Sequence, residues 1–454
     1  MTNTSISKKP KITTMRNSYV LMLSLICLLV APVNAQVPAD TKPMNFSLNE
    51  ARDYALNNSP VLLNSARDVE IAKKKIWETT AMGLPQASIN SSYSYSPQLA
   101  GLSDQLGEFI TDFNPDDLKT SFLMSAQIDQ LVFSGPYIIG LQAAKTYAYL
   151  SVLAESKSKI GIVESITNTY FTALVARESK SILDSTLIAA QKTLFESEQM
   201  YKNGFVESTD VDQIRILESN IRSSLSVAER QIAIVERMLK FQMGVPIDQP
   251  VVLTDKIDPL IGLMNLEVAV IDSFRLENNI DYRLMDLQEK LKEYNLKYSK
   301  SQYLPTVRGF YAYYKSLDNN FFNDQSPNTY GLSLSFPIFS SGQRISQVSQ
   351  RKLEYMKSQT DKETGAESLL LQYESALSIF LSAQDIFNLQ KVNRDLSLQI
   401  YKKSNTKFRE GIGSSLDLNT TQQQYFDSES NYFSALMTLV AAKSKLESLL
   451  SDQY

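Results

Sequence analysis

Two aspartates occupy equivalent places after two similar turns, and they are the charged side chains with the clearest repeated setting. Asp210 follows Gly204 by six residues, and Asp417 follows Gly411 by six residues. Ser414 stands three residues before Asp417, a spacing typical of a first helical turn, where a hydroxyl caps backbone N–H groups and an acid is favoured. The simplest role for Asp417 is therefore helix capping, and Asp210 is its counterpart after the first of the two turns.

Two residue types common in catalytic and metal sites, histidine and cysteine, are absent or nearly absent from the sequence. It contains no histidine, which excludes histidine acid–base chemistry, Ser-His-Asp triads and histidine metal sites. The only cysteine, Cys27, lies in an apolar N-terminal stretch, so we expect no disulfide and no cysteine metal site in the mature chain. The sequence also lacks a phosphate-binding loop motif. We therefore expect no catalytic residues, no metal, no cofactor and no enzyme activity.

The N-terminus has the composition of an export signal at residues 1–35. Basic residues precede an apolar run at 19–30, and a small-x-small cleavage site ends at Ala35. The basic residues are Lys8, Lys9, Lys11 and Arg16. A membrane anchor is the alternative, but the apolar run is shorter than the roughly 20 residues of a spanning helix. Met15 is an alternative start, and 36–46 would form an N-terminal linker.

The charge balance argues against a nucleic-acid partner. The full chain has a formal net charge of −4, and cleavage of the signal would remove basic residues and no acids. Nucleic-acid-binding domains instead carry basic surfaces. After residue 35 the sequence has no apolar run long enough for a membrane helix. We therefore expect the exported chain either to be soluble outside the inner membrane or to span a membrane by strands.

The sequence is one unit written twice. Residues 51–95 resemble residues 271–315, and in both segments Leu-Pro ends the helical part. The copies differ most where 97–120 is longer than 316–328, so both of these segments are expected to be surface loops. The predicted domains are a first repeat at 47–250, a linker at 251–266 and a second repeat at 267–454.

Each repeat predicts the same order of elements. A helix, expected at about 47–83 and again at 267–303, stops at Leu-Pro because proline ends helices and restricts the preceding residue. Two strands follow, and then a proline-free helical run of roughly 60 residues, or about 95 Å. Gly204 and Gly411 are expected to supply the positive φ at which this run reverses. The strands are expected at 86–96, 121–133, 306–315 and 329–339, and the helical hairpins at 138–243 and 343–452.

The four predicted strands have one apolar side and one polar side. Phe122, Met124 and Ile128 alternate with Ser125 and Gln127, the period-two pattern of a strand between two environments. The apolar sides are rich in tyrosine, and about 10 residues is the length of a tilted membrane-spanning strand. The alternative is a sheet in a water-soluble protein, with one face exposed to solvent. If the strands cross the membrane, several chains must share one barrel. Four strands cannot close a barrel alone, and unpaired strand edges are not tolerated in lipid.

The order of elements resembles the outer membrane efflux protein family, the TolC-like channels, over about residues 45–454. The resemblance is carried by the duplication, the element lengths, the Leu-Pro stops, the Phe-Ser-Gly-type junctions and the glycine turns followed by Ser or Thr and Asp. It implies a mainly α fold with membrane β-structure. Long periplasmic helical hairpins would form an α-barrel, and each chain would give four strands to a trimeric 12-stranded outer-membrane β-barrel.

The same resemblance implies a location and partners. The chain would be a homotrimer in the cell outer membrane, in contact with outer-membrane lipid and extending into the periplasm. Its partners would be a periplasmic adaptor (membrane fusion) protein and an inner-membrane pump of the RND or ABC type.

The resemblance also implies a periplasmic gate at the hairpin tips. Asp417 stands where the family has an acid at the tunnel mouth, so three copies would form a ring of carboxylates, and Asp210 is its first-copy equivalent. Thr420 and Phe408 replace the aspartate and tyrosine common at gate positions, and Gly413 stands where an arginine is common. The contacts that hold the gate closed must therefore differ from those common in the family. The tips would also dock the adaptor, with plain packing as the alternative for the apolar candidates. The turn and docking candidates are Gly204, Gly411, Gly413, Val211, Leu416 and Leu418.

The function implied is a passive exit duct of a tripartite efflux or secretion system, with energy supplied by the inner-membrane pump. The alternative is a non-conducting periplasmic coiled-coil scaffold whose strands pair in a soluble sheet. An exported hydrolase would need paired acids in a pocket, and the predicted fold offers no such cleft.

Overall fold

The computed structural model describes residues 42–95, 120–263, 274–316 and 327–451. The chain divides into two units, Met1–Met44 and Asn45–Tyr454, and apart from the first residue of β1 the second unit holds the elements described below. The predicted signal at 1–35 lies outside the described residues, as do most of the predicted loops at 97–120 and 316–328.

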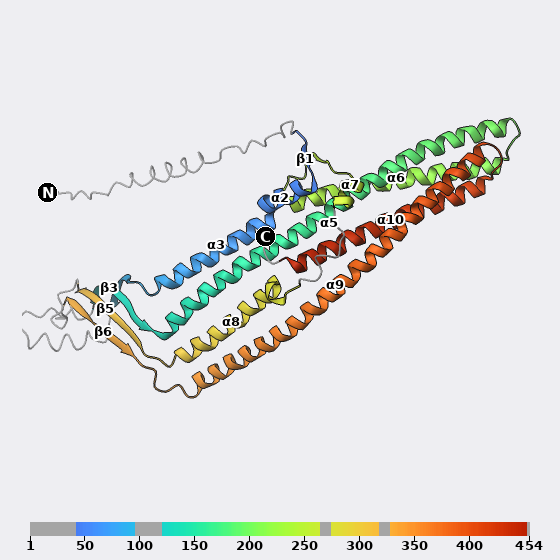
Figure 1. The fold of residues 1–454 in the computed structure, drawn as a ribbon. Helices are drawn as coiled ribbons and strands as arrows, with labels where there is room; N and C mark the ends of the chain where they lie inside the picture. The colour runs from blue at the N-terminus through green and yellow to red at the C-terminus, as the bar shows by residue number, and fades with distance from the viewer. Residues whose placement is uncertain (1–41, 96–119, 264–273, 317–326, 452–454) are drawn as a thin grey trace, which may run out of the picture. The chain divides into compact units, whose positions relative to one another are not determined.

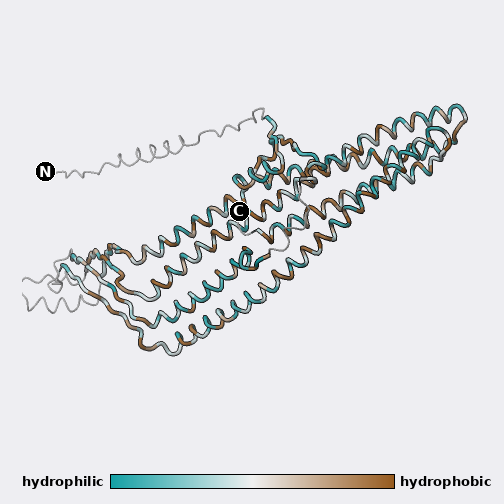
Figure 2. Tube along the Cα trace, in the orientation of Figure 1, coloured by the Kyte–Doolittle hydropathy of each residue, from teal (hydrophilic) through white to brown (hydrophobic). Residues whose placement is uncertain are grey.

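Two long helical hairpins dominate the second unit. α5 (Gly135–Lys202) pairs with α6 (Ser208–Met243), and α9 (Gln343–Arg409) pairs with α10 (Ser415–Leu450). The hairpins lie side by side, with α10 in contact with both α5 and α6 (Figure 1). Figure 2 shows polar and apolar residues alternating along these helices. In the described ranges, no helix carries an apolar stretch long enough to cross a bilayer.

The hairpin core includes the middle of α5 and much of α10. Ile166, Tyr170 and Phe171 are fully buried there, and α10 buries Leu436 and Leu439. Burial of side chains of this size stabilises a fold by about 1.5–3 kcal/mol each. The middle of α5 therefore belongs to the core of the unit, and α2, α3, α6, α8 and α10 all contact α5.

The first predicted helix, 47–83, was wrong as a single helix. The structure divides it at Ser59, because Pro60 has the fixed φ that suits the first turn of a new helix. Gly244 packs against this break, where a Cβ would lie 2.2 Å from the carbonyl oxygen of Asn58. The two helices are α2 (Leu48–Asn58) and α3 (Pro60–Ala81).

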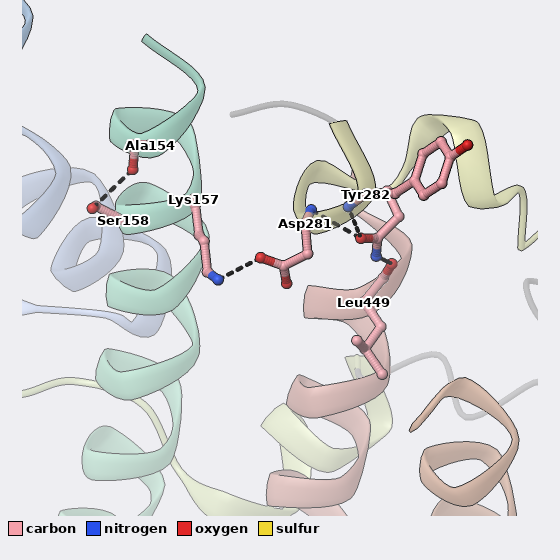
Figure 3. Close-up of polar contacts among 7 residues, drawn as sticks. Ala154, Lys157, Ser158, Asp281, Tyr282 and Leu449 are labelled. Carbon is pink, nitrogen blue, oxygen red and sulfur yellow. Dashed lines mark hydrogen bonds and ion pairs between the residues drawn. The ribbon is translucent and has the colours of Figure 1, made fainter. Parts of the chain in front are cut away.

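Residues 267–273 of the second predicted helix, 267–303, lie outside the described residues, and in the described part the α-helix is α8 (Ile280–Ser301). Asn279 caps α8 by accepting a hydrogen bond from the Asp281 N–H at 2.9 Å, and its Nδ2 donates to the Leu449 carbonyl at 2.9 Å. The Asp281 carboxylate bonds Lys157 of α5 (Figure 3). The start of α8 is therefore tied to α5 and to the end of α10. A short 3₁₀ helix, η3 (Leu276–Asn278), precedes it.

Four strands form one antiparallel sheet in the order β2-β3-β5-β6. They are β2 (Gln86–Tyr95), β3 (Thr120–Ser134), β5 (Thr306–Ser316) and β6 (Asn328–Ser335). The two repeats meet where β3 pairs with β5, which leaves β2 and β6 as the edges of this sheet. The strand predicted at 329–339 was too long. β6 ends at Ser335 because Pro337 has no N–H for a ladder hydrogen bond.

The register gives the sheet one apolar and one polar face. Ile128 lies opposite Tyr311, which lies opposite Tyr330, so large apolar side chains follow one another across the apolar face. Gln127, next to Ile128 in β3, lies on the other face, opposite Ser88 of β2. Tyr330 is 82% exposed in the single chain. An exposed apolar face of this kind marks a membrane or partner surface.

The predicted linkers contain regular elements. The N-terminal linker ends in β1 (Met44–Phe46), and the inter-repeat linker forms β4 (Val251–Leu253) and α7 (Ile257–Leu263). Thr254 donates its N–H to the Phe46 carbonyl at 3.0 Å. The Tyr170 hydroxyl lies 2.9 Å from that carbonyl and 3.1 Å from Asp255 Oδ2. The inter-repeat linker is thereby fastened to the core of α5.

Candidate functional site

The two hairpin turns have the same geometry. Gly204 has a φ of 77° and Gly411 a φ of 76°, the left-handed region that favours glycine. Phe205 donates its N–H to the Met200 carbonyl at 2.9 Å, and Ile412 donates to the Lys407 carbonyl at 3.0 Å. These hydrogen bonds close the last turn of each long helix. The expected positive φ of both glycines is therefore present.

Gly413 is required by close contact. Its φ is not in the left-handed region, but a Cβ at this position would lie 2.9 Å from the Phe408 backbone nitrogen. The backbone of the second turn has no room for a side chain here. This contact gives a physical reason for the absence of the arginine that the family resemblance implies at this position.

Asp417 combines a capping position with a bond across its own hairpin. Its N–H donates to the Ser414 hydroxyl at 3.1 Å, which makes Ser414 the N-cap of α10. Its Oδ2 accepts a hydrogen bond from the Ser404 hydroxyl of α9 at 3.0 Å. The side chain is exposed. The carboxylate is thus fixed at the tip, at the positive end of the α10 dipole.

Asp210 has the same place in the first hairpin but a different partner. Its Oδ2 accepts from the Glu207 N–H at 3.2 Å in a capping box at the start of α6. Its Oδ1 accepts a hydrogen bond from the hydroxyl of Ser415, the first residue of α10. The Ser415 oxygen also lies 2.8 Å from Gln213 Oε1. Asp210 therefore joins the second hairpin to the first.

An ion pair makes a second link between the hairpins. Arg409, at the end of α9, donates from Nε and Nη2 to the two carboxylate oxygens of Glu196 on α5, at 2.9 and 3.1 Å. The hydrogen bonds to Glu196 raise the pKa of Arg409 above its usual value. Both side chains are partly exposed. The bidentate geometry fixes the direction of this contact, which is characteristic of arginine and carboxylate pairs.

An apolar cluster lies behind these polar links and takes side chains from all four helices. Phe408 of α9 and Leu418 of α10 are buried in it, together with residues of α5 and α6. The first-hairpin members are Ala190, Ile214, Leu217 and Ile221. Val211 is also buried. In this chain the gate candidate Phe408 and the docking candidates Val211 and Leu418 are therefore packing residues.

The exposed apolar residues at the tips are different ones. Phe205 is 77% exposed, Ile412 73% and Leu416 64%. Only Leu416 was expected from the sequence. The signal for the other two was available, because each is the large apolar residue directly after an equivalent turn glycine. Thr420 is exposed and donates its hydroxyl proton to the Leu416 carbonyl at 2.8 Å, so its side chain is bonded within α10.

A groove runs between the two turns at the tips. Gly204, Phe205 and Asp210 line its first-hairpin side, and Gly411 and Ser415 line its second. Phe408 also lines it. The arrangement can hold two hairpins together and can present apolar side chains outward. No cluster of three or more potential metal ligands occurs in the part of the chain that the structure describes.

The architecture is that of a duplicated channel-type chain, with a two-faced sheet and paired helical hairpins. The model of the outer membrane efflux protein family matches residues 51–245 and 274–451, and the chain belongs to this family. It is accordingly a TolC-like protein of the outer membrane that extends into the periplasm. The predicted fold of the chain, mainly α with long helical hairpins and four strands, is confirmed by this membership and by the similarity of the fold to solved channels.

Several solved structures share the fold at low sequence identity. CusC is 15% identical with a TM-score of 0.73, and the match covers 92% of this chain and 95% of CusC. VceC from Vibrio cholerae is 15% identical with a TM-score of 0.68, covering 88% of this chain and 95% of VceC. The CmeC channel of Campylobacter jejuni is 15% identical with a TM-score of 0.69, covering 90% and 87%. No curated protein matches the sequence significantly.

Proposed function

We propose that this chain forms a passive trimeric exit duct of a tripartite efflux or secretion system. The observation that carries the proposal is the open sheet, which has an exposed apolar face and two unpaired edges, β2 and β6. Unpaired edge strands are not tolerated in lipid, so a membrane sheet of this kind requires closure. Closure by three copies would give 12 strands, and the helices attached to them would continue the wall into the periplasm.

The gate of this duct is proposed to lie at the hairpin tips. The Ser415–Asp210 bond and the Arg409–Glu196 ion pair hold α9 and α10 against the first hairpin. Release of both links, together with separation of the apolar cluster around Phe408 and Leu418, would let the second hairpin move away and widen the tunnel mouth. Asp417 is proposed to face that mouth, where three carboxylates would favour cations.

The partners are proposed to be a periplasmic adaptor and an inner-membrane pump of the RND or ABC type. The exposed apolar residues Phe205, Ile412 and Leu416 at the hairpin tips suit a docking surface for the adaptor. The chain itself would then act as a conduit, and the pump would supply the energy. No enzymatic step is assigned to this protein.

The test is to purify the full chain from membranes in detergent and reconstitute it in planar bilayers. A heat-sensitive trimer with stable single-channel conductance is the expected result. A water-soluble monomer released with the periplasm would refute the duct. That result would favour the non-conducting coiled-coil scaffold instead.

A further inference from the structure

A cavity lies between the two hairpins, away from the turns. It has a volume of about 450 Å³, and α5, α6 and α10 supply its walls. One part of the lining is apolar and aromatic, and another part carries carboxylates and amides. The residues that define these two parts are Leu183, Phe426, Phe433, Asn220, Asp427 and Glu429.

Glu429 is a buried acid in this wall. The residue is only 8% exposed, and burial raises the pKa of its carboxyl above the ordinary value. From α9, Arg394 favours the charged form while Asp395 opposes it, and from α5, Glu178 opposes it. On α10 itself, Tyr425 hydrogen-bonds the carboxylate. Acids therefore outnumber bases around Glu429.

The nearest base is already engaged by other groups. The Arg394 guanidinium forms an ion pair with Asp395 at 2.8 Å and stacks 4.1 Å from the centre of the Tyr432 ring. Within the described residues, no lysine or arginine lies in ion-pair distance of Glu429. A buried carboxylate in this situation is incompletely compensated, and a positive charge beside it would restore the balance.

We propose that this cavity binds an organic cation with an aromatic or apolar body. The carboxylate of Glu429 would pair with the positive charge, while Phe426 and Phe433 offer ring surfaces to its body. A bare metal ion does not fit, because the described residues hold no cluster of three potential ligands. The proposal goes beyond the duct and does not depend on the gate.

The binding test uses the full chain in detergent and the planar aromatic cation ethidium as the probe. Ethidium is expected to bind saturably, and Glu429→Gln is expected to weaken binding about tenfold, equivalent to roughly 1.4 kcal/mol. Glu447→Gln is the matched control, because Glu447 lies on the same helix and lines no part of this cavity. The variant Glu429→Gln removes a buried charge without changing the shape of the side chain, so it is expected to fold.

The pH dependence of ethidium binding distinguishes binding at the Glu429 cavity from nonspecific partition of ethidium into detergent. As the pH falls through the raised pKa of Glu429, the carboxyl is protonated and ethidium affinity is expected to fall. The Glu429→Gln variant should lose that pH dependence. Equal affinity in wild type and variant, or no saturable binding to the wild type, would overturn the proposal. Conductance measured on the same preparation tests the duct separately.

Discussion

The hydrogen bond between Ser415 and Asp210 is the sharpest place to test the proposed gate. Ser415 is 2% exposed, and its hydroxyl is the only side-chain group of α10 that bonds the Asp210 carboxylate in the described structure. Substitution of Ser415→Ala removes this bond and leaves the capping box of Asp210 with Glu207 intact. The change therefore loosens the contact between hairpins without removing a helix cap.

The expected change in channel opening follows from the strength of the lost hydrogen bond between Ser415 and the charged Asp210. A hydrogen bond to a charged group contributes about 1.5–3 kcal/mol. Asp210 is only half-buried and can be hydrated in an open tip, so the lower end of this range applies. At about 1.4 kcal/mol per factor of ten, the ratio of open to closed channels should rise about tenfold.

Single-channel recording in planar bilayers measures this ratio directly. Ser448→Ala is the matched control, because the hydroxyl of Ser448 bonds only the Lys445 carbonyl of its own helix. Glu196→Gln should open the channel by a smaller factor, because the ion pair with Arg409 is partly exposed and screened by salt. If Ser415→Ala and its control have the same open probability as the wild type, the proposed link between the hairpins does not hold the gate.

Three further variants test other parts of the molecule. Asp417→Asn should lower the cation preference of the channel and its block by trivalent cations, both measured in planar bilayers, and unchanged selectivity would contradict the carboxylate ring. Gly411→Val should leave a heat-sensitive trimer but abolish export of a dye from cells, because a β-branched residue is strained at a φ of 76°. Gly244→Ala should lower Tm, since positive φ costs about 1–2 kcal/mol and the new Cβ would meet the Asn58 carbonyl at 2.2 Å.

Local features of the fold could be read from the sequence because they depend on neighbouring residues. The proline-free run and the turn glycine indicated a long helix that ends just before Gly411, and α9 ends at Arg409. The turn glycines indicated positive φ because few other residues adopt it readily. Alternation in the strands indicated two faces, and the register of β3 and β5 gives the sheet those two faces.

The partners at the hairpin tips could not be read in the same way. Arg409 and Glu196 are 213 residues apart in the sequence, and no periodic pattern relates them. Phe408 was placed at the gate by resemblance, yet it is buried in a cluster with residues of α5, α6 and α10. Only the packing of the two hairpins reveals this burial. The break before Pro60 was missed because the apolar pattern continues on both sides of it.

The two copies of the unit also differ in what holds their long helices, and this difference bears on which hairpin moves. Contacts of α5 extend to α2, α3, α6, α8 and α10, whereas α9 packs mainly on α8 and α10. Large apolar side chains of α9 such as Leu353, Leu389 and Val392 remain exposed in the single chain. Under the proposed trimer, a neighbouring copy would cover them. The second hairpin would then be held by a subunit boundary, by two polar links at its tip and by the apolar cluster that it shares with the first hairpin. The first hairpin has further contacts with α2, α3 and α8. Opening is therefore expected to begin at the tip of the second hairpin, where two polar links and the apolar cluster around Phe408 and Leu418 join it to the first hairpin.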